Sequence, residues 1–118
     1  MRVPILLSVA LATIGLAAQA PAKTTEELRG FFQQNCVKCH GADGSAHGSD
    51  GRKLKGFDFT NAVEMANQTD AEMARTIRKG LFFGWRMPAF KHQLSQQDAD
   101  RMVQEVLRKA QKGKAIAP

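Results

Sequence analysis

The chain of 118 residues lacks several features that mark whole classes of protein. Its two cysteines allow one disulfide at most, which excludes a disulfide-framed scaffold. Its four prolines and ten glycines are ordinary usage, which excludes collagen-like and low-complexity chains. No stretch alternates apolar and polar residues with β-branched side chains, so little or no sheet is expected. Hydrophobic residues nevertheless make up 43% of the chain, which predicts one small globular domain rather than a disordered tail.

The N-terminus lacks an apolar run long enough for a confident membrane span. Residues 5–18 are mostly apolar or small, and as a helix they would cover about 21 Å, against about 30 Å of bilayer hydrocarbon. The basic start at Arg2 and the small-x-small sequence Ala18-Gln19-Ala20 are typical of a secretory signal peptide. We therefore expect a signal peptide at residues 1–20, a mature exported domain at residues 21–118 and no stable membrane anchor after cleavage.

Acidic side chains are outnumbered, 11 against 17 basic ones, and the formal net charge is +6. The basic residues form no run of five or more, so most of them are expected on a solvated surface. A basic surface favours an anionic partner. Because the chain is expected to be exported, we predict an acidic protein surface rather than nucleic acid as that partner.

Three helices are predicted from their start signals. Residues 24–27 and 69–72 have the spacing of a capping box, and Ser95 begins a third signal of the same kind. The first helix is expected to carry Cys36 on its apolar face, and the second to end at Gly80. The third helix, read as continuous, has an apolar stripe formed by Ala99, Met102, Val103, Val106, Leu107 and Ala110. Residues 61–65 are compatible with one more helical turn, and residues 41–56 have loop composition.

The residues able to do chemistry gather at residues 36–40, Cys-Val-Lys-Cys-His. Cysteines three positions apart lie on one side of a helical turn, where both can form thioether bonds to the vinyl groups of one haem. His40 follows one turn after Cys36, so its imidazole can reach the haem iron from the same face. This spacing is the attachment pattern of c-type haem.

Three other interpretations compete with haem attachment. A thioredoxin-like redox pair uses Cys-x-x-Cys but is expected near a βαβ pattern, which this sequence does not have. A zinc site could combine Cys36 and Cys39 with His47 or His92, but the chain lacks the paired-ligand spacing of zinc modules. A structural disulfide between the two cysteines is compatible with export.

Methionine is the second candidate iron ligand. Met87 precedes Pro88, which biases its backbone toward an extended conformation and places a thioether on a stiffened loop. Met73 and Met102 are more simply core residues on helical stripes. Met65 is a weaker candidate, and Met1 leaves with the signal peptide. Packing of Met87 beside Trp85 and Phe90 is the competing interpretation.

Together these motifs resemble a class I monohaem c-type cytochrome. The resemblance covers residues 24–111: a capped helix leads into Cys36-x-x-Cys39-His40-Gly41, and a glycine-rich loop, a middle helix, a Met-Pro loop and a final helix follow. It implies an all-α fold of three main helices and short helical turns around one covalently bound haem c. It further implies Cys36 and Cys39 as attachment points, His40 as proximal and Met87 as distal iron ligand. Family members cross the first and last helices, which would bring Phe31 or Phe32 near Val103 and Leu107, although this last helix has no aromatic residue.

The ligand set predicts a function. Histidine and methionine ligation favours reduced iron and fills both axial positions, which predicts a carrier of one electron rather than an enzyme. The haem propionates need donors, for which Trp85, Arg86, Arg52 and Lys55 are candidates, whereas His47 and His92 are expected on the surface.

We therefore expect a soluble, monomeric electron-transfer protein of the periplasm or a thylakoid lumen. It would dock transiently at its haem edge with membrane or periplasmic redox partners. One alternative is a dedicated haem subunit or electron acceptor of one periplasmic dehydrogenase or oxidase. A haem enzyme or gas-binding protein, in which Met87 is not a ligand, is a further alternative.

Overall fold

The computed structural model describes residues 15–16 and 19–118. The predicted signal peptide at residues 1–20 lies mostly outside the described residues. The described part is built of helices and loops and contains no strand, only two isolated bridges, His47 with Lys53 and Leu81 with Met87. The predicted all-α fold class is confirmed. Among the described helices, none combines the length and the apolar character needed to cross a bilayer.

The first helix, α1 (Thr25–Asn35), begins at the predicted capping box. The Thr24 hydroxyl accepts from the Glu27 N–H, and the Glu27 carboxylate accepts from the Thr24 N–H. The prediction that α1 carries Cys36 is wrong by one residue, because Cys36 caps α1 and begins the short helix α2 (Val37–His40). The Cys36 N–H donates to the Phe32 carbonyl at 2.8 Å, so the last hydrogen bond of α1 is made at its cap residue, Cys36.

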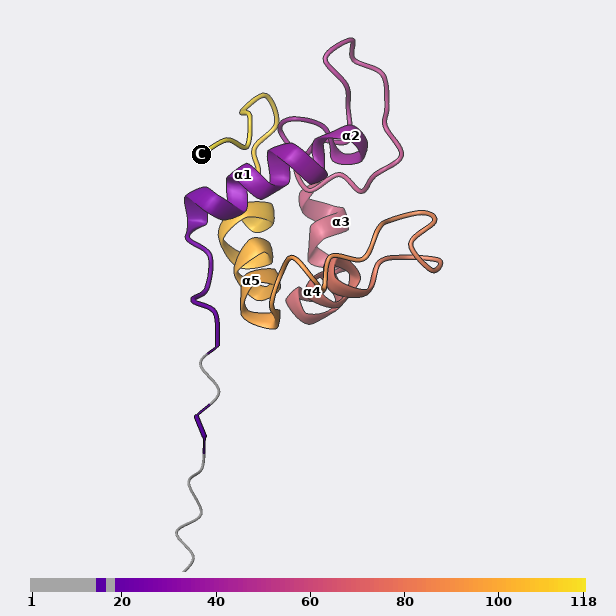
Figure 1. Cartoon of the computed structure of the whole chain (residues 1–118). Helices are drawn as coiled ribbons and strands as arrows, with labels where there is room; N and C mark the ends of the chain where they lie inside the picture. The colour runs from indigo at the N-terminus through magenta and orange to yellow at the C-terminus, as the bar shows by residue number, and fades with distance from the viewer. Residues whose placement is uncertain (1–14, 17–18) are drawn as a thin grey trace, which may run out of the picture.

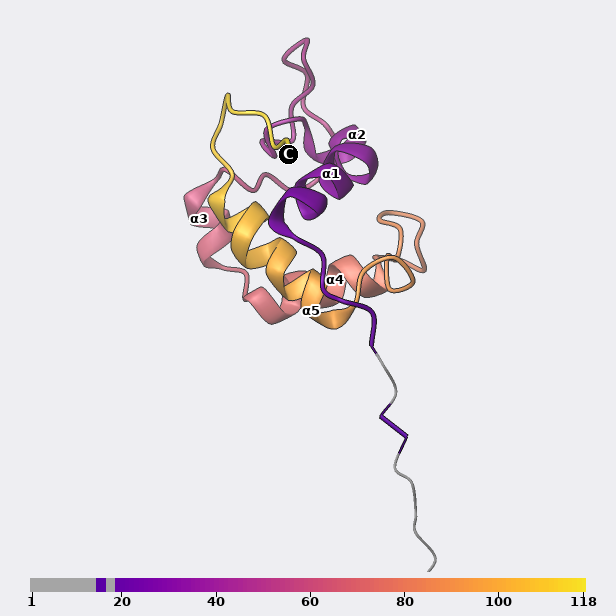
Figure 2. The same ribbon diagram turned by 60° about the vertical axis from the view of Figure 1, so that its left-hand side comes forward.

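Two helices follow the long loop. In α3 (Ala62–Ala66) the Asn61 side chain caps the first turn, and in α4 (Asp70–Lys79) Thr69 forms the predicted capping box. Gly80 ends α4 with φ of 71°, a conformation that glycine adopts without strain. Helix α4 then lies beside the next helix, α5 (Gln96–Arg101), in both ribbon views (Figures 1 and 2).

The C-terminal helix is predicted to be continuous, but in the structure it consists of three segments. Helix α5 passes into a π turn, η1 (Met102–Val106), and a 3₁₀ turn, η2 (Leu107–Lys109). The Leu107 N–H reaches the Met102 carbonyl, five residues back, so the helix is widened by one residue at this point. The predicted apolar stripe is still buried, apart from the partly exposed Ala110.

The core lies between the first and last helical segments. Helix α1 packs on η1 and crosses the C-terminal segment (Figure 1), as the family resemblance implies. Phe31 and Phe32 line one small cavity together with Leu107, and the Phe31 ring packs edge-on to Phe90 with 5.4 Å between centroids. Arg108 ties this segment to the α3–α4 connection by donating to Asp70 and to two backbone carbonyls.

Candidate functional site

A cavity of about 460 Å³ opens beside α2. Its volume is in the range of pockets that bury a small molecule or cofactor, about 300–1,000 Å³. Its wall comes from α2 and its cap residue, the loop that follows α2, α4, the loop between α4 and α5, and single residues of α1, the α3–α4 connection and η2. The apolar and sulfur-bearing residues that line it are Cys36, Cys39, Phe57, Phe59, Met73, Ile77, Leu81, Phe82, Met87, Pro88, Phe90 and Leu107.

Both cysteines of the motif line this cavity as free thiols, so the structure contains no disulfide between them. Burial and, to a smaller extent, the neighbouring Cys39 raise the pKa of the Cys36 thiol to about 12. Such a thiol is protonated at neutral pH, unlike the low-pKa thiolate of a thioredoxin-like site. In the part of the chain that the structure describes, no three His, Cys, Asp or Glu side chains are grouped to hold a metal ion, so the zinc alternative lacks a ligand set.

His40 is buried in the same wall, with 9% of its surface exposed. Its Nδ1 lies 3.0 Å from the Phe57 carbonyl oxygen, which can only accept, so Nδ1 carries the proton and Nε2 keeps a free lone pair. Burial lowers the pKa of His40, and the hydrogen bond to Phe57, which raises that pKa, does not cancel the effect. The Phe59 ring stacks on the imidazole at 4.6 Å between centroids. The residue is therefore a neutral, oriented imidazole, the form that binds a metal.

Gly56 makes this arrangement sterically possible. Its N–H donates to the Cys39 carbonyl at 2.8 Å. A Cβ at this position would lie 2.3 Å from that carbonyl oxygen and 2.7 Å from His40 Nδ1. In the sequence Gly56 is only the end of a glycine-rich loop, and no local pattern singles it out from the other glycines there.

Met87 lines the cavity from the loop between α4 and α5. Its carbonyl accepts from the Leu81 N–H at 3.0 Å, which closes the loop at its base. A Cβ on Gly80 would lie 2.4 Å from that same carbonyl oxygen, and Gly80 has positive φ, so glycine is required here. Of the other methionines, Met73 also lines the cavity from α4, Met102 lines only the smaller neighbouring cavity, and Met65 lines neither.

Of the four candidate propionate donors, two line the cavity and two lie outside its lining. Arg86 and Lys55 line the cavity. Trp85 is not among the lining residues and is 89% exposed, and Arg52 is paired with Asp50 on an exposed loop at 3.0 Å. His47 donates from Nδ1 to the Ser45 carbonyl at 2.7 Å and is also outside the lining.

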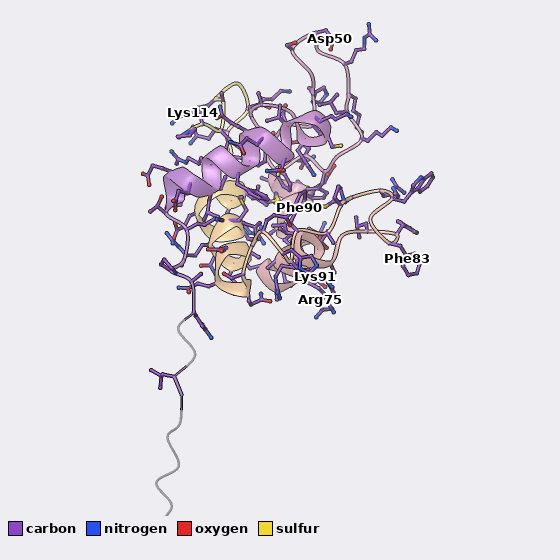
Figure 3. All side chains as sticks on the ribbon, viewed as in Figure 1. Asp50, Arg75, Phe83, Phe90, Lys91 and Lys114 are labelled. Carbon is purple, nitrogen blue, oxygen red and sulfur yellow. The ribbon has the colours of Figure 1, made fainter. Side chains whose placement is uncertain are left out.

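The cavity therefore fits one haem. Residues 36–40 supply two thiols and a neutral imidazole, a separate loop supplies a thioether, and aromatic rings form apolar walls (Phe90 is labelled in Figure 3). Arg86 and Lys55 offer positive charge for the two carboxylates of such a macrocycle. The two cysteines are at the spacing that c-type attachment requires.

Comparisons with known proteins agree with this fit. The family described as cytochrome c oxidase, cbb3-type, subunit III matches residues 23–104. A solved structure titled "KustC0563 c-type cytochrome" has a TM-score of 0.55 at 23% identity, covering 71% of this chain and 96% of its own. A tyrosine-to-phenylalanine mutant of the same protein gives a TM-score of 0.53 at 25% identity, covering 71% and 98%. A search of curated proteins finds no match.

The family match extends over more than half of the chain and includes every cavity-lining residue except Leu107. The solved neighbours share the fold of this chain. The family's c-type haem is bound covalently, as the cysteine spacing predicts. The chain thus belongs to the family of cytochrome c oxidase, cbb3-type, subunit III, and is a monohaem c-type cytochrome with covalently bound haem c, a family whose members transfer electrons through their haem.

Proposed function

We propose that the protein is an exported, diffusible carrier of single electrons. The observation that carries this proposal is that His40 and Met87 line one cavity from two different elements. His40 would be the proximal and Met87 the distal ligand, with Cys36 and Cys39 as covalent attachments. The bound haem supplies reversible one-electron chemistry at its iron, at a potential that methionine and histidine ligation raises.

The protein's own residues prepare both ligands. The Phe57 carbonyl holds the proton on Nδ1 of His40 and so leaves Nε2 for the metal. On the other loop, Gly80 allows the backbone of Met87 to approach closely enough to close the loop. If His40 and Met87 both bound the haem iron, they would leave no position on it for a substrate, so we propose no catalytic activity for the isolated protein.

Arg86 and Lys55 are the proposed partners of the haem propionates, because both line the cavity. Trp85 remains a prediction from the sequence, and the cavity lining gives it no support. The net charge of +6 favours transient, salt-sensitive docking on acidic faces of redox partners. We place this monomeric carrier in the periplasm, where c-type cytochromes are generally found after export.

A second candidate function is a dedicated haem subunit of one oxidase or dehydrogenase. The observation that favours it is the description of the matching family, which names a subunit of a cytochrome c oxidase. This alternative predicts a stable complex of fixed stoichiometry when the protein is purified gently from its native membrane fraction. The carrier proposal predicts that the protein purifies alone.

Visible spectra of protein matured with c-type haem assembly test the ligand assignment. We expect a sharp low-spin spectrum in the reduced state that carbon monoxide leaves unchanged, and a weak far-red band from sulfur ligation in the oxidised state. The variant Met87→Ala should lose that band and bind carbon monoxide while the haem stays attached. Met65→Leu, at a buried methionine outside the cavity lining, is the matched control and should behave as the wild type. Carbon monoxide binding by the reduced wild type would contradict the assignment of Met87.

A further inference from the structure

The loop between α4 and α5 projects away from the body of the molecule (Figure 1). We call residues 81–87 the aromatic loop. It is closed at its base by the bridge between Leu81 and Met87, and internally by the hydrogen bond from Trp85 N–H to the Phe82 carbonyl at 3.0 Å. Figure 3 shows Phe83 on the outer side of this projection, away from the helices.

The aromatic loop exposes an unusual amount of apolar surface. Two of the large hydrophobic residues exposed in the described part of the chain lie within it and outside the cavity lining, Phe83 at 111% and Trp85 at 89%. Phe82 and Phe83 have φ of 51° and 55°, left-handed values that are unfavourable for residues with a Cβ. The loop thus holds aromatic side chains in water on a strained backbone, which is an observation that calls for a function.

Positive charge lies within this loop and in the chain segments on either side of it. Residues 73–97 contain five Lys or Arg and no Asp or Glu. Lys79, Arg86 and Lys91 are exposed, and the Arg86 guanidinium lies 5.6 Å from the centre of the Phe82 ring. A partner must therefore accept aromatic rings and also carry negative charge.

We propose that the aromatic loop is a reversible anchor on the surface of an anionic phospholipid bilayer. A projecting tip of Phe and Trp rings, with Arg86 in the loop and Lys or Arg in the flanking segments, matches the bilayer interface, where aromatic rings insert at headgroup level and Lys or Arg contact anionic headgroups. A bilayer deforms around such a tip, whereas a protein would need a preformed apolar pocket with an acidic rim. The small size of the tip makes the attachment reversible.

This anchor has a consequence for the haem site. Leu81, Phe82, Arg86 and Met87 belong to the aromatic loop and also line the cavity. Binding through the tip would therefore hold the cavity mouth next to the membrane surface, where membrane redox proteins are found. The inference concerns the surface of the loop and does not depend on which residue is the sixth iron ligand.

Vesicle flotation of the haem-loaded protein tests the anchor. We expect the protein to float with vesicles of mixed phosphatidylglycerol and phosphatidylcholine, to stay behind with phosphatidylcholine alone, and to be released as salt rises. Phe83→Ser should lower the bound fraction about tenfold, because it removes an inserted ring. Phe83→Leu should retain most of the binding. Val63→Ser, at an exposed apolar residue of α3 outside the loop, is the matched control and should change nothing.

The haem spectrum distinguishes failure of the membrane anchor from failure of the proposed haem ligation. Phe83 does not line the cavity, so all variants should keep the wild-type spectrum, and a changed spectrum would report damage to the site rather than loss of the anchor. Absence of flotation with anionic vesicles at low salt would overturn the anchor. A Phe83→Ser variant that floats as well as the wild type would overturn it too. If that variant also slowed reduction by a purified redox protein, the loop would be a protein-docking element instead.

Discussion

At the residue scale, two glycines allow the backbone to approach His40 and the Met87 carbonyl closely. Gly56 lies against the Cys39 carbonyl and His40, and Gly80 lies against the Met87 carbonyl. Neither residue contributes a functional group to the site. Each is required because a methyl group there would overlap backbone, which moves less easily than a side chain.

The first prediction concerns Gly56→Ala. Because the new Cβ would be 2.3 Å from the Cys39 oxygen, the loop must shift away from His40. We expect a loss of about 3 kcal/mol in the free energy of unfolding of the haem-loaded protein. Thermal unfolding followed at the haem band measures it.

Gly30→Ala is the matched control for this prediction. Gly30 lies inside α1, and a Cβ there would meet only the Pro118 side chain at an ordinary 3.7 Å. Alanine should stabilise the helix by up to about 1 kcal/mol. A Gly56→Ala protein that unfolds at the wild-type temperature would show that the close approach to His40 is not structurally required.

At the scale of elements, the C-terminal tail holds the loop that follows the haem-attachment motif. The Ile116 N–H donates to the Ala42 carbonyl at 2.8 Å, and the Gly113 N–H donates to the Asp43 carboxylate at 2.7 Å. Ile116 is 8% exposed and packs into the core. Figures 1 and 2 show the tail turning back toward α1. Two segments about 70 positions apart are thus joined next to α2.

Asp43 makes this contact depend on pH. Burial raises the pKa of its carboxyl, but hydrogen bonds from Ser45 and the Gly113 N–H outweigh burial and lower the pKa to about 2. The unfolded value is about 3.9, so the ionised carboxylate stabilises the native state above about pH 4, and this contribution is lost as pH falls toward 2.

The prediction is that Asp43→Asn lowers the free energy of unfolding at neutral pH by about 1 kcal/mol. Between about pH 4 and 2 the wild type should lose stability more steeply than the variant, so the two curves converge. Urea unfolding at a series of pH values measures both effects. Asp50→Asn, on an exposed loop away from the tail, is the control. Parallel curves for the wild type and Asp43→Asn would contradict the assignment.

At the scale of the whole molecule, the cavity occupies the place of a core. Apolar side chains of α4 and of two loops that belong to the hydrophobic core or pack against it also line one space of about 460 Å³. A chain of this size buries a smaller share of its surface on folding than a large domain does. The bound macrocycle therefore contributes to folding as well as to function.

The double variant Cys36→Ser/Cys39→Ser tests this dependence. Without thioether attachment we expect little retained haem, reduced helix content and no cooperative unfolding transition at the temperature of the haem-loaded protein. Far-ultraviolet circular dichroism during heating measures both. Cooperative unfolding of the haem-free variant at the holoprotein's temperature would show that the polypeptide core is sufficient by itself.

The sequence by itself determined the features that depend on near neighbours. The capping boxes at Thr24, Thr69 and Ser95 join residues three apart, and the spacing of Cys36, Cys39 and His40 is set within one helical turn. The buried stripe of the last helix follows from helical period alone. Family resemblance then supplied the haem and the all-α fold, which the structure and the comparisons confirm.

Only the tertiary structure decided which distant groups meet. The contact of Phe57 with His40 spans 17 positions and depends on a glycine with no local signal. The tertiary structure also decided which candidate propionate donors line the cavity. Arg86 and Lys55 do, whereas Trp85 is 89% exposed and does not. The π turn after Arg101 leaves the apolar stripe buried. The spacing of hydrophobic residues in the sequence therefore does not reveal this turn. These features arise from packing between helices and loops that are distant in the sequence. The pattern of residues along the chain indicates only the local preference of each segment, so it does not predict them.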